Sequence, residues 1–145
     1  MRVLALLVSA ILAGCSAPSS TRDATKERWY VETVTKVAQM NRDAEASFKN
    51  GKSDQAAATI EQAEPLVARL LSVPHPSLEA AEAASDLDDL YGRMLLSNRH
   101  YGWARLQFQK NLSRWRHWDP QTPDTERRFK QALAEIAECD RHIEE

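Results

Sequence analysis

The segment Ser-Arg-Trp-Arg-His-Trp-Asp-Pro at residues 113–120 has the residue types that bind an anionic ligand. Guanidinium and imidazole groups can donate hydrogen bonds to phosphate or carboxylate oxygens, and indole rings can stack on cations or cover an apolar ligand. The residues concerned are Arg114, Trp115, Arg116, His117 and Trp118. They would suit an anionic glycan, a phospholipid headgroup or a charged partner. The alternative is structural, with Trp115 continuing an apolar helix face and Trp118 closing the helix end.

Charge is segregated along the chain on either side of residue 93. Residues 77–92 contain five acidic residues and no Lys or Arg, whereas residues 93–118 contain six basic residues and no acid. This pattern fits either a polarised binding surface or two neighbouring helices that pair electrostatically. Asp86, Asp88 and Asp89 have calcium-binding side chains, but the glycine and distal glutamate of a calcium loop are absent. We therefore interpret them as part of a solvated acidic helix.

No set of residues has the spacing of a catalytic or metal centre. Glu138 and His142 lie four residues apart, on one helix face, but a zinc site needs more ligands than this pair supplies. No serine lies in a recognisable nucleophile turn, and the remaining histidines show no ligand spacing. They are His75, His100 and His117. We therefore expect a binding protein without a catalytic residue, a metal ion or a non-covalent cofactor.

The elements that position these residues are helices. Apolar residues recur at intervals of three and four in the stretches 30–48, 56–70, 80–95, 101–115 and 129–143, and none of these alternates strictly. Thr122-Pro123 has the pattern of an N-cap followed by proline in the first turn. Pro65 lies inside the second stretch and should kink or split it. The sequence predicts an all-α fold of antiparallel helix pairs at 24–72 and 77–118, with a capping helix at 123–145.

The first fifteen residues have the pattern of an export signal. Val3 to Ala13 is apolar except for Ser9, follows the basic Arg2 and is too short to span a bilayer. Leu-Ala-Gly-Cys at 12–15 resembles the bacterial lipobox. This resemblance implies cleavage after residue 14, a diacylglycerol thioether on Cys15 and acylation of its new amino group. The alternatives are an ordinary signal peptide with a chance cysteine and an apolar start to a cytosolic helix.

The remaining composition suits a small helical domain on a tether. Residues 15–23 form the lipidated tether, and residues 24–145 form the all-α domain. The net charge of −2 becomes −3 when Arg2 is removed with residues 1–14, which gives no reason to expect nucleic-acid binding. The lipoprotein resemblance also implies that Ser16, which follows the cysteine expected to carry the lipid, favours the outer membrane over the inner one. Cys139 would then be the remaining thiol, either buried or used in an intermolecular bridge.

Two segments, at 44–65 and 91–112, are similar to each other. In the first, Ala44 and Phe48 precede a turn that Ala56 and Ile60 follow; in the second, Gly92 precedes Tyr101, Ala104 and Phe108. Both resemble the tetratricopeptide repeat, in which small residues let two helices cross closely. The departures are the spacing of 48 residues between Ala56 and Ala104, Arg99 in place of the turn glycine, Asn111 in place of a small residue, and the missing final proline.

The resemblance implies a groove lined by the first helix of each pair. At matching positions this face carries Asn41, Glu45, Lys49, Asp86, Asp89, Arg93 and Ser97. We therefore expect a lipid-anchored, periplasm-facing adaptor whose partner is another envelope protein. One alternative is a module that binds peptidoglycan or lipid headgroups through residues 114–118. A second is an accessory subunit of an envelope enzyme.

Overall fold

The computed structural model describes residues 23–144, which are helical apart from turns and short loops. The elements in chain order are a short 3-10 helix η1 (Ala24–Lys26) and the α-helices α1 (Arg28–Lys49), α2 (Ser53–Leu71), α3 (Leu78–Ser97), α4 (Tyr101–Arg116) and α5 (Pro123–Glu144). The all-α class and the five expected helical stretches are confirmed. Cys15 and the expected signal peptide at 1–14 lie outside the described residues, as does the tether up to residue 22.

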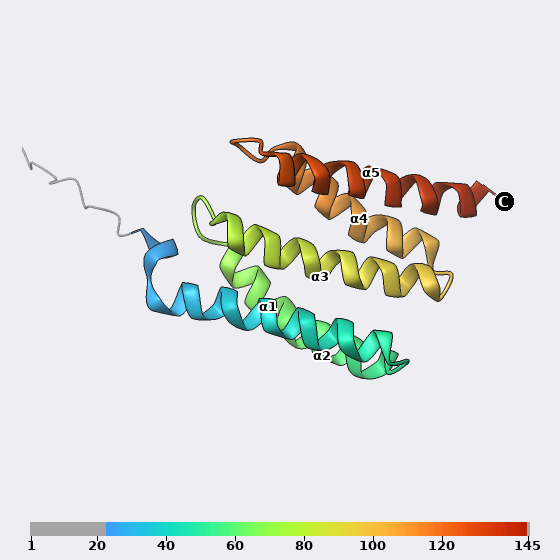
Figure 1. The fold of residues 1–145 in the computed structure, drawn as a ribbon, viewed down its shortest axis with the longest axis horizontal. Helices are drawn as coiled ribbons and strands as arrows, with labels where there is room; N and C mark the ends of the chain where they lie inside the picture. The colour runs from blue at the N-terminus through green and yellow to red at the C-terminus, as the bar shows by residue number, and fades with distance from the viewer. Residues whose placement is uncertain (1–22, 145) are drawn as a thin grey trace, which may run out of the picture.

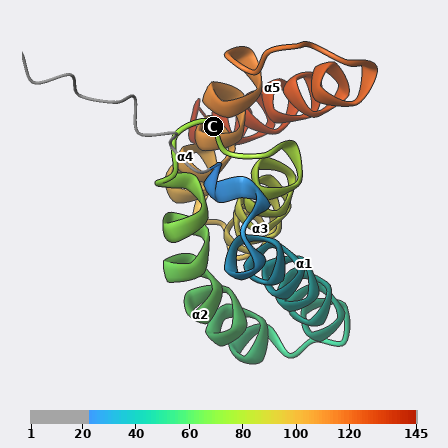
Figure 2. The ribbon, with the colours of Figure 1, turned by 90° about the vertical axis from the view of Figure 1, so that its left-hand side faces the viewer.

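The helices form two layers, with α1, α3 and α5 in one layer and α2 and α4 in the other (Figures 1 and 2). Consecutive helices run in opposite directions, which confirms the expected antiparallel pairs. The central helix is α3, which packs against α1, α2 and α4. Nine of its residues are buried, so it is the part of the chain on which the other helices are arranged.

Three apolar clusters hold the layers together. Two of them join α1, α2 and α3 through small and aliphatic residues, and the third joins α4 to α5 with help from the end of α3. The third cluster contains Ala104, Phe108, Ile136 and Cys139. The last helix thus covers the apolar edge of α4, as expected for a capping helix. The first two clusters are formed by Ala44, Ala56, Ile60, Ala63, Leu87, Leu90 and Met94, and by Tyr30, Val37, Leu70, Ala80 and Ala83.

The crossing of α3 and α4 depends on a glycine. A Cβ atom at Gly92 would lie only 2.5 to 2.9 Å from three ring carbons of Phe108, which is itself fully buried. No larger residue fits there without moving the ring, because buried side chains are closely packed. The small residue expected at a close helix crossing therefore performs that role in the second pair.

The turns that end α1 and α3 share one geometry. Gly51 follows the end of α1 with a φ of +73°, and the N–H of Lys52 donates to the carbonyl of Ser47. Arg99 occupies the equivalent place after α3 with a φ of +61°, and the N–H of His100 donates to the carbonyl of Leu95. Both are Schellman turns, for which glycine is the usual residue.

The two sequence signals involving proline have different outcomes. Thr122 caps α5 as expected: its hydroxyl accepts from the N–H of Thr125 at 3.2 Å, and the Thr125 hydroxyl accepts from the N–H of Thr122 at 2.8 Å. Pro65 does not split the second helix, because α2 runs without interruption through it. The neighbouring apolar contacts of Leu66 and Val67 with the α1 side of the core offset the hydrogen bond that the proline removes.

Candidate functional site

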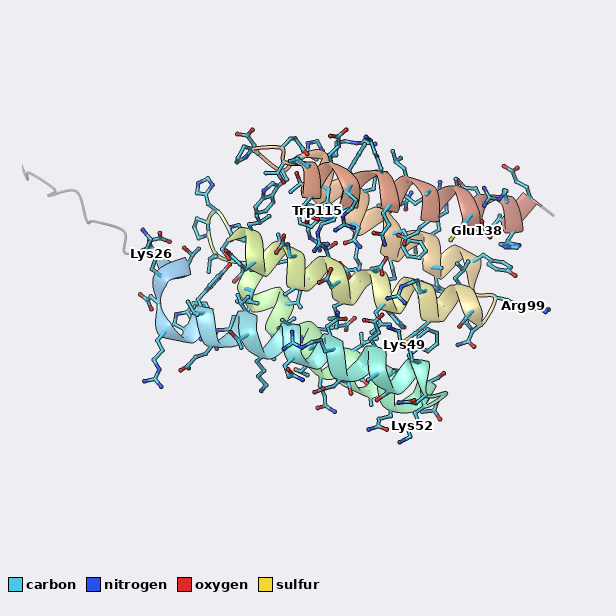
Figure 3. All side chains as sticks on the ribbon, in the orientation of Figure 1. Lys26, Lys49, Lys52, Arg99, Trp115 and Glu138 are labelled. Carbon is cyan, nitrogen blue, oxygen red and sulfur yellow. The ribbon has the colours of Figure 1, made fainter. Side chains whose placement is uncertain are left out.

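The 114–118 segment divides into an internal and an external part. Trp115 is fully buried, and its indole N–H donates to the Ser85 hydroxyl at 2.9 Å (Figure 3). Arg114 is also largely buried, since its guanidinium lies 2.9 Å from the Asp88 carboxylate and donates to the side chain of Asn111. These two residues hold α4 on α3. They are therefore unable to serve as free ligands for an external anion.

The other three residues of the segment lie at the surface, where α4 ends. Arg116 and His117 are exposed, and Trp118 is half-buried with its ring 5.8 Å from the Trp115 ring. A shallow cavity of about 280 Å³ lies beside them. It is lined by Trp115, Arg116, Gln121, Glu126, Phe129 and Lys130. The cavity is therefore bordered by aromatic side chains and by the cations Arg116 and Lys130, which are exposed to solvent.

The residues expected to line a groove on α1 and α3 lie on one layer, and most of them pair with each other. Arg93 bonds Asp89 at 2.8 Å and approaches Glu45 at 3.6 Å, while Lys49 lies 3.2 Å from Glu45. Asp86 is 2.6 Å from Arg128 of α5. Because these charges are already paired within the chain, the face offers few free charges to a partner.

Two further members of that expected groove are less informative. The Ser97 hydroxyl donates to the carbonyl of Met94 at 2.8 Å, so it serves its own helix. Asn41 has a buried side-chain oxygen without a hydrogen-bond partner among the described residues. Neither arrangement indicates a ligand on this layer.

Helix α5 adds two polar residues to this face that the sequence did not single out. The Gln131 amide donates to Asp89 at 3.1 Å and to Glu135 at 2.9 Å. Burial, together with a hydrogen bond that protonated Glu135 donates to the Asp89 carboxylate, raises the pKa of Glu135 from 4.5 to about 8. A cavity of about 90 Å³ lies among these side chains. The site is a small polar contact between α3 and α5, which only the fold brings together.

A larger depression lies on the opposite face, between α2 and α4. It has a volume of about 360 Å³, its floor is the α3 side chains Leu87 and Tyr91, and it is lined mainly by apolar surface. We call it the α2–α4 groove. Its remaining lining residues are Ile60, Glu64, Val67, Ala68 and Leu71 of α2, Asp88 of α3, and Lys110 and Arg114 of α4.

The groove continues along α2 toward the start of that helix. A second hollow of about 300 Å³ is lined by Ala57, Ile60, Glu61, Glu64 and Tyr91. Three of these residues also line the first hollow, so the two form one continuous depression along α3. Both lie on the α2 face that repeats every three or four residues from 57 to 71.

The two walls of the groove differ in charge. On α2, Glu61 and Glu64 are exposed, and within residues 23–144 neither forms an ion pair. On the other side, Lys110 and Arg114 of α4 share one carboxylate, that of Asp88, at 3.4 and 2.9 Å. Two cations against one anion leave this wall positive. The groove therefore has an apolar floor between an acidic and a basic wall.

The same face of α4 carries an exposed indole. Trp103 and Gln107 share the face of Lys110, because these residues recur at spacings of three and four. Trp103 is 65% exposed, and the buried Gln107 side-chain oxygen has no hydrogen-bond partner within the described chain. Large exposed rings of this kind are enriched where proteins bind each other.

The other residues with metal-binding or reactive side chains take part in contacts within the fold. In residues 23–144 no group of three or more His, Cys, Asp and Glu side chains could hold a metal ion. His142 lies 3.1 Å from Glu138 and stacks on Tyr101. Cys139 is fully buried, and that burial raises the pKa of its thiol. Among the same residues, no helix combines the length and apolar character needed to cross a membrane.

The sequence pattern contained only part of the signal for the groove. Lys110 and Arg114 belong to the basic run at 93–118, and Tyr91 lies within the apolar stretch at 80–95. The α2 wall was missed because its residues Ala57, Glu61, Glu64 and Ala68 are small or acidic, as on an ordinary solvated helix face. A helical projection of α2 would indicate the groove, because it places these residues next to the apolar face of the same helix.

Comparison with known proteins returned no match: no protein-family model fits the chain, and no curated protein or solved structure is significantly similar to it.

Proposed function

We propose that this chain is a lipid-anchored adaptor of the bacterial cell envelope, which binds a segment of a partner protein in the α2–α4 groove. The observation that carries the proposal is an apolar floor of Leu87 and Tyr91 between walls of opposite charge. Apolar surface with charged rims is the usual form of a protein-binding groove. The proposal makes the chain a binding protein and not an enzyme.

The similarity to tetratricopeptide repeats is part of this proposal. It is supported by the packing of α3 on both helices of the preceding pair and by the close contact of Gly92 with Phe108. The proposed partner site differs from the face that this resemblance implies. On that face Glu45 and Asp89 pair with Lys49 and Arg93, whereas Glu61 and Glu64 beside the groove form no ion pair with any residue in the described range 23–144.

Anchoring to the membrane is proposed through a lipid on Cys15, with the helical domain in the periplasm and the outer membrane as the favoured location. The test is incorporation of an alkynyl palmitate by growing cells. We expect label in the natural chain and in the Cys139→Ser variant, and none in Cys15→Ser. Label that persists in Cys15→Ser, or that is absent from the natural chain, would contradict the anchor.

The groove is tested by photo-crosslinking in cells. A photoreactive amino acid placed at Ala57, Ala68 or Lys110 should give one common crosslinked product, because all three line the groove. The same amino acid at Lys36 or Arg42, exposed on α1, should not give that product. The captured protein is then identified and purified, so that its binding can be measured directly.

A matched pair of variants separates the groove from the rest of α2. Ala68→Trp fills the groove, whereas Ala58→Trp places the same ring on an exposed position of the same helix outside it. The crosslink from 110 and the measured binding should be lost in Ala68→Trp and kept in Ala58→Trp. Equal binding by both variants, or the same product from the α1 positions, would refute the groove as the partner site.

A second candidate function is the binding of peptidoglycan or lipid headgroups at the end of α4. It is supported by the cavity at the end of α4, whose lining includes the Phe129 side chain and the cations Arg116 and Lys130. Pull-down with cell-wall sacculi and with anionic vesicles tests it. The double variant Arg116→Ala/Trp118→Ala should lose most of this binding, and undiminished binding would exclude the candidate.

A further inference from the structure

We infer that the occupant of the α2–α4 groove is an amphipathic α-helix with one basic and one acidic edge. This inference rests on the proposed function, since it names the kind of segment that the groove receives. It is carried by three properties of the described residues: the spacing of the floor, the small number of free backbone groups in the walls, and the charges of the two walls.

The floor has the spacing of a helix surface. Leu87 and Tyr91 are one turn apart on α3, and Ile60, Val67 and Leu71 continue the apolar surface along α2. Side chains in such rows leave holes into which a second helix inserts residues spaced three and four apart. From 57 to 71 the groove extends for about 21 Å at 1.5 Å per residue, which matches a helix of about fourteen residues.

An extended segment would fit this groove less well. Its floor and both walls belong to helices, whose backbone N–H and C=O groups are hydrogen-bonded within the helix except at the helix ends and at the Glu61 carbonyl, which Pro65 leaves without a donor. An extended strand pressed onto Leu87 and Tyr91 would therefore leave its own backbone groups without partners, at a cost in free energy. A helix satisfies those groups internally and presents only side chains to the floor.

The walls determine the charge of the helix edges. Glu61 and Glu64 face one edge and favour Lys or Arg there. On the other wall Arg114 is held by Asp88, so the exposed Lys110 carries the excess positive charge and favours Asp or Glu. Turning a bound helix end for end exchanges its two edges. A helix with unlike edges therefore has one preferred direction in the groove, whereas a helix with two like edges meets repulsion at one wall in either direction.

The test uses three synthetic peptides of about fourteen residues with the same Leu stripe at helical spacing. One has a Lys edge and a Glu edge, one has two Lys edges, and one has two Glu edges. Binding is measured by fluorescence anisotropy to the full-length chain in lipid nanodiscs, with empty nanodiscs as the blank. We expect the mixed-edge peptide to bind about tenfold more tightly than either of the others.

Charge reversal in the protein provides the specificity control. In Glu61→Lys/Glu64→Lys both walls are positive, so the peptide with two Glu edges should become the tightest by about tenfold. The control variant Glu32→Lys/Asp43→Lys makes the same change in net charge on exposed positions of α1 and should keep the original order. Circular dichroism melts establish that both variants are folded.

Equal binding of the three peptides, or an unchanged order in Glu61→Lys/Glu64→Lys, would overturn the inference. So would a dimer of this chain with its contact along the groove, because a second copy would then be the occupant. Groove crosslinks to a partner combined with no peptide preference would refute the helix and leave the proposed function standing. Loss of both the groove crosslinks and the peptide preference would refute the two together.

Discussion

Glu135 carries a proton at neutral pH because it lies half-buried against Asp89. Its pKa in the folded chain, about 8, is above the ordinary value of 4.5. A raised pKa stabilises the fold fully below the lower value, and this contribution is lost as the pH rises through the higher one. The charged groups facing it are Asp89 and Arg93 of α3. The contact of α3 with α5 should therefore weaken between about pH 5 and pH 9.

The variant Glu135→Gln measures this effect, because the amide keeps the hydrogen bonds and cannot ionise. At pH 9 we expect it to be more stable than the natural chain by about 1 kcal/mol, a value reduced for solvent screening at a half-buried side chain. At pH 5 the two chains should have the same free energy of unfolding. Urea titrations at both pH values give the comparison, and identical pH slopes would contradict it.

At the level of single residues, the sequence predicted the place of a residue on its helix better than the residues that it contacts. The choice for Trp115 between ligand and core could be framed from its place on the apolar stripe, and the structure places it in the core. The bond from Trp115 to Ser85 joins residues thirty positions apart, and periodicity says nothing about such a contact. The same is true of Glu135 with Asp89, which are neighbours only because α5 folds back along α4 and so brings its side chains to α3.

For the helix pair α3 and α4, the sharpest prediction concerns Gly92. Gly92→Ala should destabilise the fold by about 2 kcal/mol, because its new methyl group overlaps the buried Phe108 ring. Phe108→Leu in the same chain should recover part of that loss by making room. The natural control is Gly102→Ala: nothing lies within 4 Å of the added Cβ, so this change should stabilise α4 by about 0.5–1 kcal/mol. Thermal melts of the variants decide the outcome.

The turns after α1 and α3 give a paired prediction. Arg99 adopts a left-handed backbone that costs about 1 kcal/mol for a residue with a side chain, so Arg99→Gly should stabilise the chain by about 0.5 kcal/mol. Gly51→Ala introduces the same strain in the equivalent turn and should destabilise it by about 1 kcal/mol. Chemical denaturation measures both, and a loss of stability in Arg99→Gly would show that its side chain stabilises the turn.

At the level of elements, the sequence was most informative where local chemistry decides. The positions of the five helices followed from periodicity, and the start of α5 followed from Thr122 and Pro123. The effect of Pro65 could not be decided, because it depends on the balance between one lost hydrogen bond and the tertiary contacts of α2. Helix propensity accounts for the lost hydrogen bond but not for the tertiary contacts.

Across the whole molecule, α3 should couple the two ends into one cooperative unit. It shares apolar clusters with α1 and α2, and its end joins the cluster of α4 and α5. Native-state hydrogen exchange should therefore give the same free energy of opening for the amides of Val37, Leu90 and Phe108, within about 0.5 kcal/mol. Clearly different values for the first and second helix pairs would indicate that the pairs unfold separately.

The α2–α4 groove could not be predicted from the sequence because it depends on how far apart two helices lie. Residue types fix which faces are apolar, but the separation of α2 and α4 follows from how each crosses α3. Those crossings depend on contacts such as Gly92 with Phe108, which involve residues far apart in the chain. The acidic residues of α2 therefore form one wall of a groove only because the fold places the basic residues of α4 across from them.

The short helix η1, at the blue start of the described chain, lies at the same end of the molecule as the loops that join α2 to α3 and α4 to α5 (Figure 1). If an acyl chain is attached to Cys15, seven residues separate the anchor from Asp23, and the eight Cα–Cα steps between them reach at most about 28 Å. This maximal length is shorter than that of α3, whose twenty residues extend for about 30 Å. If the proposed anchor is present, the end of the helical body at η1 lies within one helix length of the bilayer, and a partner would meet the groove close to that membrane.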